Sequence, residues 1–266
     1  MQFVMQPSTV YEYPLWGVGL SLAGAAALGA IVLGLAVYRL LSLDLRRRHN
    51  DVAAAIFSVI GVTFAVLLAF VAMVVWEHYN AAKATSDAEA GCVRDVYYVS
   101  LGFSQPDKAL LRDGILGYIE TVIRVEWPAQ ARGLSVASNS AWLNKLNAIA
   151  ADLKPAGTAD DIRQAMLSLS LMRLSDAREQ RLMAADTTVP AVVWIVTLIG
   201  GALTVAFASL LGVPSLGMHL AMSAVMAISG TLVLIMIIAL NNPFRGDFRV
   251  SAEPFEQVIA QVRASE

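Results

Sequence analysis

Two arginines three residues apart, Arg178 and Arg181, are the side chains best suited to hold negative charge. Like charges at this spacing share one face of a helix and repel each other unless acids lie opposite them. If their helix runs antiparallel to the long helix that starts near residue 50, equal rises per residue place both arginines opposite residues 83–89. That segment contains Asp87 and Glu89, so we expect these two acids to pair with the arginines.

The same arginines allow a second interpretation. In an oligomer, one pair from each subunit would form a ring of positive charge that attracts anions to a vestibule. Truncation of Glu89 to alanine separates the two hypotheses. A loss of stability supports ion pairing, whereas unchanged stability with altered anion conductance supports the ring.

Few other residues suggest chemistry. No nucleophile has a recognisable base and no pair of acids stands out, so we expect no enzyme activity. Cys92 is the only cysteine and the three histidines are scattered, so the sequence predicts no metal site. With a net charge of −2 and no glycine-rich phosphate loop, it also predicts no nucleic-acid partner and no cofactor.

The composition is typical of a membrane protein. Hydrophobic residues make up 57% of the chain and charged residues only 15%, against about 25% in soluble domains. We therefore expect an all-α integral membrane protein with four transmembrane helices. The expected parts are an N-terminal transmembrane hairpin at 1–77 (spans 15–41 and 52–76), a helical extramembrane bundle at 78–188, a C-terminal transmembrane hairpin at 189–240 and a tail at 241–266.

The second span is a long, uninterrupted apolar stretch. From Val52 to Trp76 it has no charge, proline, asparagine or glutamine, and its length exceeds the roughly 30 Å hydrocarbon core of a bilayer. No proline follows until Pro106, so we expect one helix to continue past Trp76 into water. Phe57, Ile60 and Phe64 lie on one stripe of this span. They could form a pore constriction that gates by dewetting, or they could be ordinary core or lipid-facing side chains.

In the 78–188 region apolar and polar residues do not alternate with the period of two that is typical of strands, so the pattern predicts helices. One helix should start near Ser104 and stop at Trp127, because a proline disfavours helix in the residue before it. A short helix should cover 140–153. A long helix should start at Thr158 and bury a face made of the following residues: Ile162, Met166, Leu169 and Met172.

Charge distribution predicts the orientation in the membrane. Arg39 and Arg46–Arg48 form the densest basic cluster, in the loop between the first two spans, and the positive-inside rule makes that loop cytoplasmic. Residues 78–188 carry 12 Lys or Arg against 13 Asp or Glu and weigh little in this rule. We expect a bacterial inner-membrane protein with residues 78–188 and both termini in the periplasm.

Several short motifs, taken in order, resemble the bestrophin-like domain family of bacterial membrane proteins. They include the stretch GVTFAVLLAFVAMVVWEHYNAA and the two arginines before Pro190. That stretch contains Trp76 and Glu77. Further motif residues are the following: Glu89 and Ala90, Tyr118 and Glu120, Glu126, Trp127 and Pro128, Trp194, and Pro243, Phe244, Arg245 and Gly246. The resemblance covers about residues 15–260.

This resemblance implies a four-span helical protein in the lipid bilayer that forms a homo-oligomeric channel for small ions, anions included. The chain departs from bestrophins in two respects: it has no acidic cluster suited to a calcium clasp, and its arginines place residues 78–188 outside the cytosol, where bestrophins keep this region. A membrane-anchored sensor or scaffold, whose bundle binds a partner or ligand, is the alternative function.

Overall fold

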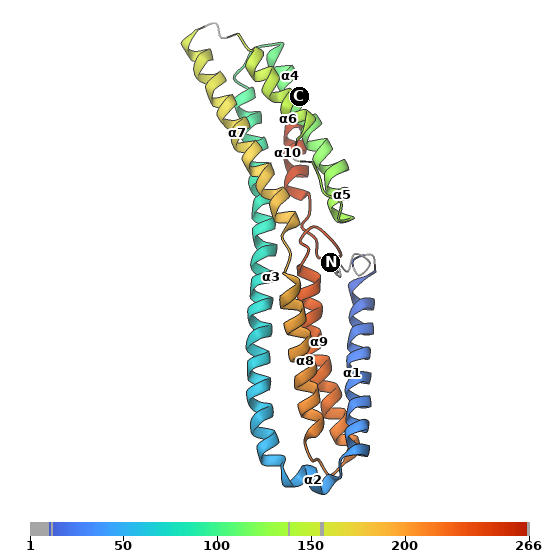
Figure 1. Cartoon of the computed structure of the whole chain (residues 1–266). Helices are drawn as coiled ribbons and strands as arrows, with labels where there is room; N and C mark the ends of the chain where they lie inside the picture. The colour runs from blue at the N-terminus through green and yellow to red at the C-terminus, as the bar shows by residue number, and fades with distance from the viewer. Residues whose placement is uncertain (1–10, 12, 138, 155–156, 265–266) are drawn as a thin grey trace. The chain divides into compact units, whose positions relative to one another are not determined.

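The computed structural model describes Tyr11 and residues 13–137, 139–154 and 157–264, and in these residues it is helical without strands (Figure 1). Contacts divide the chain into two compact units. The span unit contains Met1–Glu77 and Thr188–Asn241, and the bundle unit contains His78–Thr187 and Asn242–Glu266. The prediction of an all-α protein is confirmed.

Four helical segments are long and apolar enough to cross a membrane, counted over the part of the chain that is described. The first is α1 (Leu15–Leu40), the second lies in α3 (Asn50–Ser100), the third ends with α8 (Ala191–Leu210), and the fourth is α9 (Leu216–Leu240). In the span unit α1 packs mainly on α9. Glycine permits this close approach, since a Cβ on Gly34 would lie 2.8 Å from the Leu220 side chain.

The connection between α1 and α3 is tied to the turn between α8 and α9. It contains a six-residue helix, α2 (Leu43–Arg48), capped by the side chain of Ser42. The Gly212 amide donates to Asn50 Oδ1 over 2.9 Å, and Arg46 Nη1 donates to the Leu211 carbonyl over 3.4 Å. These bonds satisfy backbone groups that leave the helices at the turn.

Helix α3 runs without a break for 51 residues, from Asn50 to Ser100. The prediction that the second span continues as helix past Trp76 is therefore confirmed. No proline interrupts the segment, and alanines, which favour helix, are frequent in it. Its first part belongs to the span unit and its remainder, from His78, to the bundle unit.

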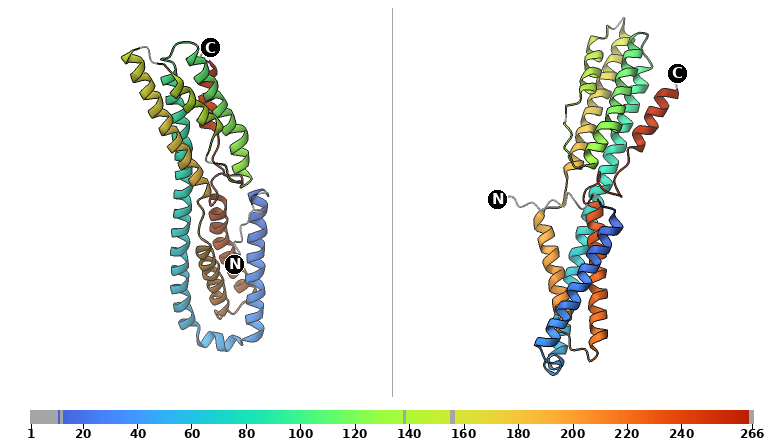
Figure 2. Two further views of the ribbon diagram at one scale, coloured as in Figure 1. Left: turned by 45° about the horizontal axis from the view of Figure 1, so that its top comes forward. Right: turned by 90° about the vertical axis from the view of Figure 1, so that its right-hand side faces the viewer.

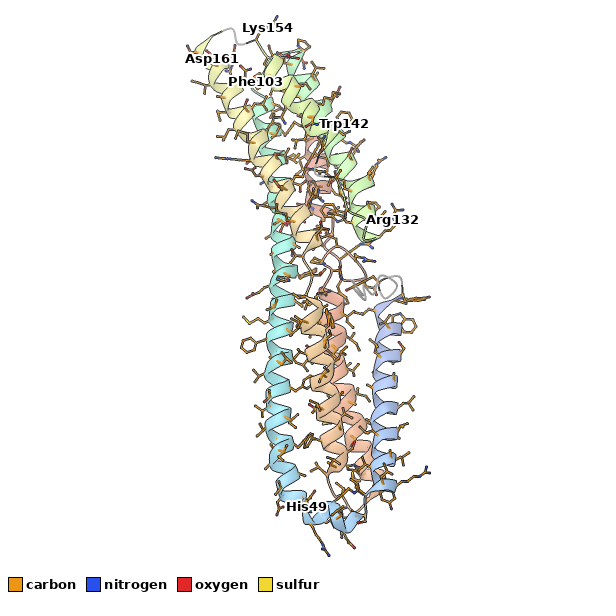
Figure 3. The ribbon with its side chains drawn as sticks, in the orientation of Figure 1. His49, Phe103, Arg132, Trp142, Lys154 and Asp161 are labelled. Atoms are coloured by element: carbon orange, nitrogen blue, oxygen red, sulfur yellow. The ribbon has the colours of Figure 1, made fainter. Side chains whose placement is uncertain are left out.

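The bundle unit is built around the second part of α3. Its other helices are α4 (Asp107–Thr121), the π-helical turn η2 (Val122–Glu126), α5 (Trp127–Ala131), α6 (Ala141–Asp152), α7 (Thr158–Asp186) and α10 (Glu253–Ala264). Both views of Figure 2 show α4, α6 and α7 side by side with α3. One apolar core joins α3, α4, α6, α7 and α10. Trp142, labelled in Figure 3, packs on α4, where a Cβ on Gly117 would lie 2.6 Å from its ring.

Two expectations for the bundle unit are wrong. The helix that begins at Asp107 does not stop at Trp127, because η2 and α5 carry it on to Ala131. The expected inner face of α7 is exposed, and its buried apolar residues are Leu167, Leu171, Leu174 and Ala177. Both sets of α7 residues repeat with the helical period, so periodicity could not tell which set faces the core.

Candidate functional site

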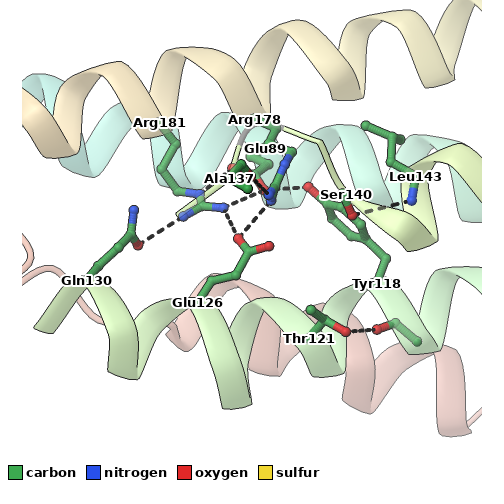
Figure 4. A network of polar contacts seen from close by, with 11 residues as sticks. Glu89, Tyr118, Thr121, Glu126, Gln130, Ala137, Ser140, Leu143, Arg178 and Arg181 are labelled. Carbon is green, nitrogen blue, oxygen red and sulfur yellow. Dashed lines mark hydrogen bonds and ion pairs between the residues drawn. The ribbon is translucent and has the colours of Figure 1, made fainter. Parts of the chain in front are cut away.

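The buried polar centre of the bundle unit is a network around Arg181 (Figure 4). Arg181 Nε donates to Glu89 Oε2 over 2.5 Å, and Nη2 contacts Glu89 Oε1 at 3.3 Å. The same Nη2 donates to Glu126 Oε2 over 2.7 Å, and Nη1 donates to Gln130 Oε1 over 3.0 Å. One guanidinium of α7 thus binds α3, η2 and α5, using the fork of donors that only arginine offers.

Arg178 extends the network by one turn of α7. Its Nη1 donates to Glu126 Oε2 over 2.7 Å, and its Nη2 donates to the Ala137 carbonyl over 3.0 Å. Tyr118 closes the network from α4, because its hydroxyl donates to Glu89 Oε1 over 2.6 Å. Glu126 therefore bridges both arginines and removes the repulsion between them.

The network is dry and its charges balance. Arg181 and Glu89 are 0% exposed, and Arg178 and Glu126 are almost fully buried. Two guanidinium groups face two carboxylates, so the cluster carries no formal net charge. Removing charged groups from water costs several kcal/mol per ion, and only complete pairing with good geometry offsets this cost. The site therefore tolerates little change in any one member.

Burial and charge act together on the protonation of the network. Burial raises the pKa of Tyr118 well above its ordinary value, and the neighbouring Glu89 carboxylate raises it further. Burial alone would lower the pKa of Arg181, but the charges and hydrogen bonds of Glu89 and Glu126 outweigh it and raise the pKa. Tyr118 is thus held neutral and Arg181 charged.

The π-helical turn positions Glu126. The Trp127 amide donates to the Val122 carbonyl, which lies five residues back, whereas in an α-helix it would donate to the carbonyl four residues back. Pro128 follows directly and has no amide hydrogen, so a regular α-helix would be strained here. The wider turn accommodates the proline, and π turns of this kind are frequent at functional sites.

Trp127 joins the motifs that are far apart in the sequence. The Arg181 guanidinium lies over its ring, 5.0 Å from the centroid, as in a cation–π contact. The Trp127 Nε1 donates to the Val250 carbonyl over 3.0 Å. The rings of Phe244 and Phe255 pack edge-on against Trp127, with centroid distances of 5.4 and 5.5 Å. The tail is thereby fixed to the network.

The segment that holds Phe244 has its own backbone constraints. Pro243 is buried, and its carbonyl accepts a 2.7 Å hydrogen bond from the Val250 amide. Gly246, inside this closed loop, has φ +75°, a conformation that residues with a side chain rarely adopt. The Pro243, Phe244 and Gly246 motif therefore shapes the loop that packs on Trp127.

Not every residue singled out in the sequence joins the network. Asp87 is exposed on the other side of α3 and pairs with neither arginine. Trp76, Glu77 and Pro128 are exposed. Two members, Glu126 and Gln130, were not expected as partners of the arginines. Their spacing of four residues places both on one helix face, which is the only signal the sequence offers for them.

The stripe expected to line a pore is half-buried in the span unit. Phe57, Ile60 and Phe64 are each partly covered. The Phe64 ring lies against α8, where a Cβ on Gly200 would be 2.9 Å away and one on Gly201 3.2 Å. Within one chain Phe64 therefore contributes to the packing of α3 on α8.

The arrangement suits mechanical and electrostatic roles better than catalysis. Every charged member of the network already has a partner, so no nucleophile is poised beside a free base. Among the residues described, no group of three His, Cys, Asp or Glu side chains could hold a metal ion. The network joins α3, α4, η2, α5 and α7 into one block.

Comparison with known proteins identifies the family. The model of the Bestrophin-like domain matches residues 24–255. A crystal structure of a mutant bacterial bestrophin homologue from Klebsiella pneumoniae is similar to this fold, with 13% identity, a TM-score of 0.66 and coverage of 91% of this chain and 98% of that one. Comparison with proteins of curated function gave no match.

Two further crystal structures, each described as a membrane protein variant, share 14% identity with the chain. Their TM-scores are 0.62 and 0.60, with coverage of 91% and 89% of this chain and of 97% and 94% of those chains. At such identities the likeness concerns the fold. Because the family model spans most of the sequence, the chain belongs to the Bestrophin-like domain family.

Proposed function

We propose that the protein is a homo-oligomeric ion channel of the bacterial inner membrane that conducts anions through a pore lined by the membrane-spanning part of α3. Membership of a family related to anion channels supports the proposal. A single chain with four such apolar spans has no evident aqueous path, so conduction requires several copies around a common axis.

The exposed surface of α7 supports the proposal of an oligomer. Helix α7 of the bundle unit exposes an apolar stripe, with the following exposed fractions: Ile162 57%, Met166 53%, Leu169 48% and Met172 64%. We place residues 78–188 outside the membrane, where lipid cannot cover this stripe. Contiguous apolar surface of this kind marks an interaction site, and a second copy of the chain is the partner we assign to it.

Packing in the span unit supports a choice of pore face on α3. Within the Phe57, Ile60 and Phe64 stripe, the Phe64 ring lies against α8 and the other two side chains are partly buried. The opposite face exposes Val59, Val62, Val66 and Phe70, which lie within one broad stripe at 100° per residue. We propose that this opposite face lines the pore and forms an apolar constriction.

Conductance and mass test the channel. The purified chain in a planar bilayer should carry single-channel current, and its mass in detergent should be a multiple of the chain mass. Met172→Lys should dissociate the oligomer, whereas Met172→Leu, which keeps the apolar surface, should not. A monomer without current would refute the proposal.

Cysteine accessibility tests the pore face. In a Cys92→Ser background, a charged thiol reagent should block channels with Val59→Cys or Val66→Cys. Phe57→Cys and Phe64→Cys should react slowly if they face α8. The reverse pattern would restore the Phe57, Ile60 and Phe64 stripe as the pore lining.

We also propose that the Arg46–Arg48 loop is cytoplasmic and that residues 78–188 and both termini are periplasmic, because the arginines are concentrated in that loop. A reporter fused to the C-terminus should show periplasmic activity. Cytoplasmic activity would invert the orientation and match that of bestrophins.

A further inference from the structure

A groove in the bundle unit is separate from the buried network. It has a volume of about 630 Å³, within the range of small-molecule sites, and lies between α3 and the segment Arg249–Gln261, which includes most of α10. The lining is mainly polar, with side chains that can donate and accept hydrogen bonds. The ion network, the packing of the tail and the proposed pore make no use of these side chains.

Three cations surround the groove without a partner of opposite charge. Lys83 and Arg94 line it from α3 and Arg249 lines it from the opposite wall. All three are exposed, and no ion pair joins any of them to another residue in the part of the chain that is described. Lys83 and Arg94 are eleven residues apart, which is about three helical turns, so both point from the same face of α3.

Two acids also line the groove and leave it with one surplus positive charge. Asp87 lies between the two α3 cations along the helix, and Glu253 lies at the start of α10. Glu253 Oε1 already accepts a hydrogen bond from Gln257 over 3.2 Å. An anionic ligand would therefore meet three free cations, and Asp87 would oppose it.

Gly91 also lines the groove, and its position inside helix α3 calls for an explanation. Glycine inside a helix destabilises it relative to alanine. No close neighbour requires it here, because a Cβ at Gly91 would meet only Arg94 Nη2, at 3.9 Å. The missing side chain leaves open space between the cations, which is what a bound molecule would need.

We propose that this groove binds a small organic polyanion, a compound with two or more carboxylate or phosphate groups, through Lys83, Arg94 and Arg249. Two acid groups on one molecule can reach cations on both walls at once, and the ligand would link α3 to the segment just before α10. The assignment holds whether or not the protein conducts ions, so it can fail independently of the proposed channel.

Isothermal titration of the full chain in detergent tests the site, with citrate as the carboxylate probe and pyrophosphate as the phosphate probe. We expect at least one probe to bind at millimolar concentration or below, more weakly as salt is added. Arg94→Gln and Arg249→Gln should each weaken binding about tenfold or more, since each removes a charge-assisted hydrogen bond. Asp87→Asn should strengthen it.

Substitutions at Gly91 separate occupancy of the groove from folding. Gly91→Ala should keep binding and raise the melting temperature, whereas Gly91→Met should obstruct the space between the cations and weaken binding at an unchanged or higher melting temperature. If neither probe binds at a concentration of about 10 mM, the proposal is overturned. Binding that is unchanged in both Arg94→Gln and Gly91→Met would overturn it as well.

Discussion

Loss of the Glu89 charge is the sharpest perturbation of the buried network. Glu89→Gln keeps the shape of the side chain but leaves two buried arginines, Arg178 and Arg181, with the single carboxylate of Glu126. Because Arg181 and Glu89 are both 0% exposed, water cannot replace the lost charge. Breaking a buried pair by removing one partner costs about 3–5 kcal/mol, and we expect a loss of free energy of unfolding of that size.

A double-mutant cycle identifies the cause of the loss. Arg181→Met alone should also destabilise, because it leaves Glu89 buried with only the Tyr118 hydroxyl as a partner. Together, Glu89→Gln and Arg181→Met leave Arg178 and Glu126 as a neutral pair. The double variant should therefore lose less free energy than the sum of the single variants, with a coupling of about 1–3 kcal/mol.

The free energies can be measured by reversible SDS titration in mixed micelles, followed by tryptophan fluorescence. Trp127, one of five tryptophans in the chain, lies against the Arg181 guanidinium, so its share of the signal reports on the network. Asp87→Asn serves as the control, since Asp87 is on the same helix, exposed and outside the network, and should change stability by at most about 0.5 kcal/mol. A loss below about 1 kcal/mol for Glu89→Gln, or strict additivity in the cycle, would refute the reasoning.

Two further predictions concern the bundle unit. Gly117→Ala should destabilise it by about 1–3 kcal/mol in the same titration, because the new Cβ would lie 2.6 Å from the Trp142 ring, whereas Gly91→Ala should not. Tyr118 has a raised pKa in the folded state, so its contribution to stability is complete below the unfolded value of about 10 and is lost as pH rises above it. Melting temperatures between pH 8 and 11 should therefore fall more steeply for the wild type than for Tyr118→Phe, and parallel curves would contradict the assignment.

The architecture could be predicted from the sequence because its determinants are local. The absence of charge and proline between Val52 and Trp76 defines a span, and the alanines beyond it define the continuation of α3. The N-cap of α6 is similar: Ser140 accepts a hydrogen bond from the Leu143 amide, so its residue type determines where the helix begins.

The candidate site could be predicted only in part. The rise along α3 and α7 brings Glu89 opposite Arg181, but rise alone does not separate Glu89 from Asp87. Two residues apart on a helix, these acids point about 200° away from each other, and burial selects Glu89. The choice depends on which face of α3 the other helices cover, which is a property of tertiary packing.

The partners Glu126 and Gln130, from η2 and α5, were harder to predict than Glu89. On a regular helix, Glu126 and Gln130 lie about 80° and 120° away from Tyr118, so they would not share its face. The π turn between them holds one extra residue and subtracts about 100°, which brings all three to the same side. A prediction that assumes 3.6 residues per turn cannot find this alignment.

The extra residue in the π turn has a consequence for related chains that lack it. Deleting one residue between Val122 and Arg124 would turn the bulge into a plain α-helix and leave the side chains before and after it in nearly the same mutual orientation. Family members that lack the bulge should therefore be one residue shorter here, with the tyrosine, glutamate and glutamine still aligned. They should also carry an amino acid with a backbone N–H where this chain has Pro128, because a proline in that tighter helix would cost about 3 kcal/mol.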